Sequence, residues 1–81
     1  MDGLDQAIHE LESSHSARFD KLVAVCTRFF GEPRVRGSHH IFKTPWPGDP
    51  RVNLQSSQGG AAKPYQIKQV LQALRRLKDQ S

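Results

Sequence analysis

Two adjacent histidines, His39 and His40, lie in the part of the sequence richest in groups able to do chemistry, the run Gly37-Ser38-His39-His40-Ile41-Phe42-Lys43. A free imidazole has a pKa of about 6.5, so it can accept or donate a proton near neutral pH. The pair follows a Gly-Ser turn signal and lies in an apparent strand. The segment therefore predicts acid–base chemistry by a strand-borne histidine, with a plain surface feature as the alternative.

Strand alternation separates the two histidines. The odd-numbered residues of a strand over residues 39–44 share one face and the even-numbered residues share the other. His39 therefore lies on the same face as Lys43, and at most one of the two histidines transfers a proton. Lys43 lies about 13 Å from His39, at about 3.3 Å per residue. That separation suits a neighbouring phosphate of a polymer rather than the reacting one.

The charge of the chain is unevenly distributed. It carries 12 Lys and Arg against eight Asp and Glu, a formal net charge of +4. Four of the eight acids lie in the first twelve residues, so the part from Ser13 onward holds all 12 cations and four acids, a net charge of +8. A basic body of this size favours RNA or DNA as a partner, before a membrane. The alternative is that the cations only keep a small protein in solution.

Composition bears on several other classes of protein. Hydrophobic residues make up 36% of the 81, and no run approaches the length needed to span a bilayer, so no membrane association is predicted. The acidic leading residues do not resemble a secretory signal. A single cysteine, Cys26, cannot form an internal disulfide and fits a cytoplasmic protein. One Cys and four scattered His form no zinc pattern, so we predict neither a metal nor a cofactor.

Three segments have the apolar periodicity of amphipathic helices: residues 2–12, 17–30 and 65–79. The second has the strongest pattern, and its apolar face comprises Phe19, Leu22, Val23, Cys26, Phe29 and Phe30. Gly31 and Pro33 end that helix. Cys26 is therefore predicted to be a core residue rather than a nucleophile.

Three short strands are predicted between the last two helices, over residues 34–36, 39–44 and 51–55. Residues 45–50 contain three prolines and are predicted as a turn in which Trp46 anchors the loop, with base stacking as the alternative. Residues 56–62 are predicted as a flexible loop. Two helices on one face of a small antiparallel sheet make an α+β sandwich, which leaves the opposite sheet face open to a ligand.

The run from Gly37 to Pro45 resembles the Gly-Ser-His motif of HicA toxins, in which an aromatic residue and a basic residue follow the histidine. The resemblance covers about residues 19–78. It implies a double-stranded-RNA-binding-domain-like α-β-β-β-α fold, here with an additional N-terminal helix. It divides the chain into an acidic helical extension, residues 1–14, and a HicA-like domain, residues 15–81.

The resemblance also implies a function. HicA proteins are the messenger-RNA-cleaving toxins of type II toxin–antitoxin pairs, and a HicB antitoxin holds them inactive. The family's catalytic histidine corresponds to His39, with His40 as second candidate. His39 would take the proton from a ribose 2′-hydroxyl without a metal, and Lys43 with Arg36 would stabilise the added negative charge. A non-catalytic RNA-binding or antitoxin-binding module on the same fold is the alternative.

The candidate RNA contacts are basic or polar residues in and around this motif: Arg36, Ser38, Lys43, Arg51, Lys63 and Lys68. Arg34, Arg36 and Arg51 could form an RNA track or a landing site for an acidic antitoxin. The fold family uses the start of its last helix for phosphate contact, which favours Lys63 and Lys68 over the distal cations Arg75, Arg76 and Lys78. Tyr65 is a further candidate for base stacking.

Overall fold

The computed structural model describes residues 3–13, 17–47, 51–56 and 60–80. The elements follow in the order α1 (Leu4–Ser13), α2 (Phe19–Phe30), β1 (Arg34–Arg36), β2 (His39–Phe42), β3 (Val52–Gln55) and α3 (Pro64–Gln80). The strands form one antiparallel sheet in the order β1-β2-β3. The predicted α+β class, with three strands between two helices and an additional helix in front, is confirmed.

Register in the sheet is set by a tight hairpin and by alternation. Gly37 and Ser38 alone connect β1 to β2, and Gly37 has a φ of 58°, a value that favours glycine. Arg36 is therefore paired directly with His39. On the other side of β2, Phe42 is paired with Val52. Both side chains are buried on the inner face, as the alternation in 51–55 predicts for Val52.

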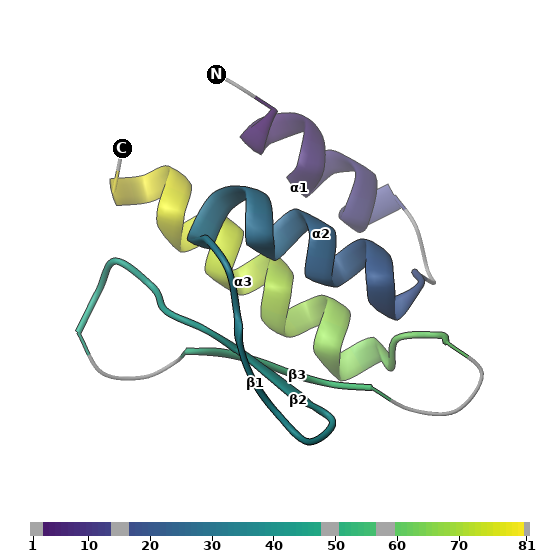
Figure 1. The fold of residues 1–81 in the computed structure, drawn as a ribbon. Helices are drawn as coiled ribbons and strands as arrows, with labels where there is room; N and C mark the ends of the chain where they lie inside the picture. The colour runs from purple at the N-terminus through teal and green to yellow at the C-terminus, as the bar shows by residue number, and fades with distance from the viewer. Residues whose placement is uncertain (1–2, 14–16, 48–50, 57–59, 81) are drawn as a thin grey trace.

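The helices all lie on one side of the sheet (Figure 1). α2 and α3 pack on the inner face, and α1 lies beyond them, mainly against α3. The fully buried centre combines Leu22 and Cys26 of α2, Leu54 of β3, and Val70 and Leu74 of α3. The helical faces predicted from periodicity therefore form one common core.

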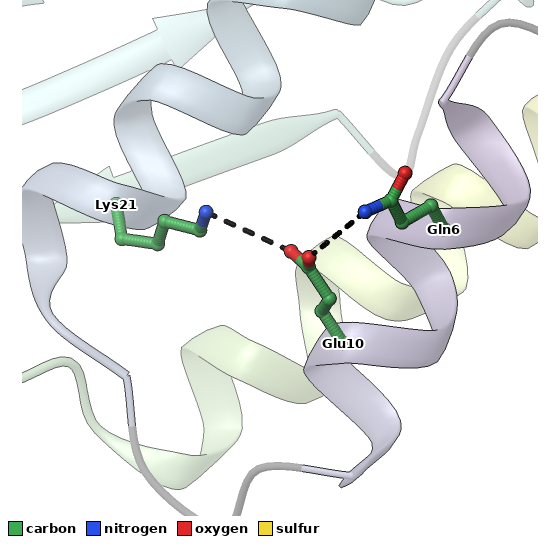
Figure 2. Close-up of polar contacts among 3 residues, drawn as sticks. All are labelled: Gln6, Glu10 and Lys21. Atoms are coloured by element: carbon green, nitrogen blue, oxygen red, sulfur yellow. Dashed lines mark hydrogen bonds and ion pairs between the residues drawn. The ribbon is translucent and has the colours of Figure 1, made fainter.

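Helix α1 joins the same core and is also tied to its neighbours by charge. Its buried residues are Leu4, Ala7, Ile8 and Leu11. Glu10 lies 3.7 Å from Lys21 of α2 and accepts a hydrogen bond from Gln6 (Figure 2). Glu12 pairs with Arg75 of α3. The predicted boundary at residue 14 therefore separates two segments that share a hydrophobic cluster.

The Lys78 ammonium lies 2.7 Å from the Asp5 carboxylate and forms a second tie between α3 and α1. The hydrogen bond to Lys78 lowers the pKa of Asp5 below its usual value. The same contact raises the pKa of Lys78 above its usual value. The pair is therefore charged on both sides throughout the neutral range, and it contributes least in strong acid and strong alkali.

Several predicted boundaries shift. The helix predicted from residue 17 begins at Phe19, and the strand predicted to reach Thr44 ends at Phe42, close to Pro45, which has no backbone donor. The loop predicted as flexible over 56–62 is held at its end, because Ala61 forms a β-bridge with Arg18 and the Ala62 amide donates to the Ala17 carbonyl. Residues 57–59 lie outside the described residues. No helix within the described ranges is long and apolar enough to cross a membrane.

Candidate active site on the open sheet face

The sheet face turned away from α2 and α3, called the open face below, presents cross-strand rows of polar side chains. One row joins Arg36, His39 and Gln55, and the next joins Arg34, Ile41 and Asn53. Directly opposed residues of antiparallel strands have Cβ atoms about 4.5–5.5 Å apart, so the side chains within each row are neighbours. The fold therefore makes Arg36 the cross-strand neighbour of His39.

His39 itself is half-buried, and its ring contacts a side chain of the neighbouring strand β3. Its Nδ1 atom lies 3.2 Å from Oδ1 of Asn53 on β3. Asn53 is paired with Ile41 in the sheet, so this contact is diagonal between neighbouring strands. His39 is thus restrained on the open face, and its Nε2 atom has no hydrogen-bond partner among the described residues.

His40, the second candidate, faces the helices. Its partner across β3 is Leu54, which is fully buried, and its ring meets the Phe19 ring edge-on at a centroid distance of 5.2 Å. Its Nδ1 atom is buried and has no hydrogen-bond partner among the described residues. The two histidines lie on opposite faces, as the alternation predicts, and His40 belongs to the packing between α2 and the sheet.

Four exposed cations lie on the same open face as His39 or at its end: Arg34, Arg36, Lys43 and Arg51. Together with Ile41 they line a shallow depression next to the histidine row. The strands contain no Asp or Glu, and no described acid lies within ion-pair distance of these cations. Among the described residues, the positive charge of the open face is therefore uncompensated, and such a face attracts a polyanion.

Ser38 has contacts within the turn. Its carbonyl accepts a hydrogen bond from the backbone N–H of Ser56 at 3.0 Å, and its hydroxyl lies 3.5 Å from Nε2 of Gln55. These contacts hold the β1–β2 turn against the end of β3. The structure therefore places Ser38 at the end of the His39 row and gives it a role in shaping the hairpin.

The two candidate lysines near the start of α3 differ in position. The backbone N–H of Lys63 donates to Gln66 Oε1, and Gln66 Nε2 donates to the carbonyl of Gln55 at 2.8 Å. Lys63 is thereby held near the end of β3 that carries the His39 row. Lys68 is exposed and extends from the helical layer, so the structure does not bring it together with His39.

The distal cations of α3 are engaged elsewhere. Arg75 and Lys78 pair with acids of α1, and the Arg76 guanidinium lies 4.6 Å from the centroid of the Trp46 ring. Trp46 is 5% exposed and meets Phe30 edge-on, so the predicted loop anchor is confirmed over base stacking. Tyr65 is 56% exposed and stays a candidate for stacking.

Cys26 is fully buried, and burial raises the pKa of its thiol to about 12. The group therefore stays protonated near neutral pH, in agreement with the predicted core role. Within the described ranges, no three His, Cys, Asp or Glu side chains come together in a way that could hold a metal ion.

Sequence reasoning missed Asn53 and Gln69. Asn53 lies 14 positions from His39, and Gln69 lies 16 positions from Asn53, so no local pattern connects them. The signal available was indirect: a polar residue between the two inward residues Val52 and Leu54 must lie on the same face as His39 once the strands pair.

Comparison of the chain with protein-family models, with curated proteins and with solved structures gives no significant match.

Proposed function

We propose that this protein is an endoribonuclease of the HicA type, a toxin that cleaves messenger RNA with His39 as general base and is inhibited by a HicB-type antitoxin. The observation that supports it best is the setting of His39. The imidazole is half-buried on a sheet face that carries four exposed cations and, among its strand residues, no acid, with Arg36 as its cross-strand neighbour.

The proposed reaction is an internal transesterification. His39 accepts the proton of a ribose 2′-hydroxyl, and the 2′-oxygen attacks the adjacent phosphorus. The bond from phosphorus to the 5′-oxygen breaks, and that oxygen takes a proton from water. The products are a 2′,3′-cyclic phosphate and a 5′-hydroxyl end. A positioned base of this kind contributes about 10² to 10⁴ in rate.

The cations have two roles in this proposal. Arg36, next to His39, can stabilise the negative charge that develops on the phosphoryl oxygens. Lys43 and Arg51 lie at the other end of the open face, where they can hold neighbouring phosphates of the strand. The same uncompensated charge suits an acidic surface of an antitoxin, which would then cover the site by competing with RNA.

His39 is favoured over His40 because it lies on the face that carries the cations. The packing of His40 against Phe19 and Leu54 instead predicts a structural role. The alternative function is a non-catalytic RNA-binding module. It needs only the cations of the open face, and in it His39 contacts RNA without transferring a proton.

The test compares wild type, His39→Ala and His40→Phe, purified and incubated with a single-stranded RNA. The second variant keeps an aromatic ring against Phe19, so it serves as a control for loss of packing. We expect His39→Ala to lower the cleavage rate by about 10² to 10⁴. His40→Phe should retain most of the activity, and a chelator in the assay should leave the rate unchanged.

Growth of a bacterial host that expresses each variant provides the second readout. Growth arrest with loss of messenger RNA in wild type but not in His39→Ala would support the ribonuclease. Folded wild type that binds RNA without cleaving it would support the non-catalytic module. Equal cleavage by wild type and His39→Ala would remove His39 from the mechanism.

A further inference from the structure

We propose that Asn53 is a positioning residue for His39: it fixes the tautomer of the imidazole, and α3 fixes Asn53 through the side chain of Gln69. The catalytic meaning of this inference depends on the proposed function. The tautomer of His39 does not depend on the proposed function, and it can be measured on the protein without any substrate.

The contact between His39 and Asn53 determines which ring nitrogen carries the proton. Nδ1 of the ring lies 3.2 Å from Oδ1 of Asn53. A carboxamide oxygen has no hydrogen to donate, so in this contact Nδ1 carries the proton and donates it. In the neutral ring, Nε2 then has a free lone pair. A general base needs such a lone pair, and the contact leaves it on the nitrogen that does not face Asn53.

Asn53 is itself held in place by the side chain of Gln69 on α3. Its backbone N–H donates to Oε1 of Gln69 at 2.7 Å, and its carbonyl accepts from Nε2 of Gln69 at 3.3 Å. One carboxamide on α3 thus makes both hydrogen bonds that a further strand would make with Asn53. On the other side, Asn53 is paired with Ile41 of β2. Because both main-chain polar groups of Asn53 point to α3, this is a non-hydrogen-bonded pair of the ladder, and Gln69 holds the N–H and the carbonyl of residue 53.

Mutation can separate the contact of Asn53 with His39 from its contacts with Gln69. Gln69 binds the main chain of residue 53, whereas His39 binds its side chain. A change of the Asn53 side chain should therefore leave the attachment of β3 to α3 in place. Because Asn53 is exposed, such a change also costs little packing.

The experiment measures the tautomer of His39 by long-range ¹H–¹⁵N correlation at a pH where the ring is neutral. It compares wild type, Asn53→Leu, Asn53→Asp and the control Gln55→Leu, with His39→Gln to assign the signals. Gln55 is a matched control because it is exposed on the same face of β3 and is paired with His39.

We expect Nδ1–H in wild type, in Gln55→Leu and in Asn53→Asp, which keeps an acceptor oxygen. Asn53→Leu should shift the ring towards Nε2–H. A wild type that already has Nε2–H, or an Asn53→Leu variant with an unchanged tautomer, would overturn the proposal.

Cleavage kinetics give the second readout. Asn53→Leu should lower kcat about five- to tenfold with little change in KM, because one neutral hydrogen bond supports a tautomer preference of this size. Asn53→Asp should retain activity but move the acid limb of the pH–rate profile upward, because a carboxylate favours the imidazolium. If the tautomers follow the expectation but no variant, including wild type, cleaves RNA, the proposed function is refuted and the positioning role of Asn53 stands.

Discussion

Gly37 is the residue at which the chain turns so that Arg36 and His39 become neighbours. With only two residues in the loop, the first must adopt a positive φ, and Gly37 does so at 58°. The space around it is open, since a Cβ added there would meet nothing within 4 Å. The requirement for glycine is therefore one of backbone conformation rather than of packing.

We expect Gly37→Ala to lower the free energy of unfolding by about 1–2 kcal/mol, the cost of a left-handed conformation for a residue with a Cβ. Gly37→Asn should recover part of the loss, because asparagine visits this region more readily. Urea unfolding of the three proteins provides the measurement. An alanine variant as stable as wild type would mean that the turn differs in solution.

Side chains of α3 bond to the outer edge of the sheet along β3. Gln66 and Gln69, one turn apart on α3, bond to the main chain of Gln55 and Asn53 and so close the outer edge of β3. The first turn of α3 therefore does two things at once: it caps its own N-terminus through Gln66 and Lys63, and it holds the strand that carries Asn53.

Helix α1 contributes to stability through its apolar face. Leu11 is 4% exposed in the common core, whereas His9 on the same helix is exposed. We expect Leu11→Ala to lower the free energy of unfolding by about 2–5 kcal/mol, the range for a buried leucine. His9→Ala should change it by no more than about 0.5 kcal/mol.

Denaturation followed by circular dichroism distinguishes the two variants of α1. Equal stability of Leu11→Ala and His9→Ala would contradict the packing of α1 on α3. It would favour instead a mobile acidic extension in front of an independent domain.

At the scale of the whole molecule, the charges are segregated. The acids Asp5, Glu10 and Glu12 of α1 pair with cations of α2 and α3 behind the sheet. The cations of the open face have no such partners among the described residues. The modest net charge of +4 therefore conceals one strongly basic surface.

This segregation predicts which cations affect RNA binding. In a His39→Ala background, Arg51→Gln should weaken the binding of a single-stranded RNA whatever its sequence. It should also reduce the slope of log affinity against log salt concentration by about 0.7, the contribution of one phosphate contact. Lys21→Gln removes the same charge but lies beside Glu10, behind the sheet, and should leave both quantities unchanged. Equal effects of the two substitutions would show that RNA responds only to net charge.

The sequence by itself determined the elements and their buried faces. Helical spacing identified Leu22 and Cys26 of α2 and Val70 and Leu74 of α3, and alternation identified Val52 and Leu54, because these periods are properties of the local backbone. It also placed His39 and His40 on opposite faces for the same reason.

Only the tertiary structure decided what lies beside His39. Arg36 is adjacent through a two-residue turn, which the sequence suggested, but Asn53 and Gln69 reach the site through strand register and helix docking. A shift of two residues in the register of β3 would keep Val52 and Leu54 on the inner face but would bring different side chains beside His39, so the alternation by itself does not select Asn53. The pairing of α1 acids with α2 and α3, which leaves the open face as the basic surface, is long-range in the same way.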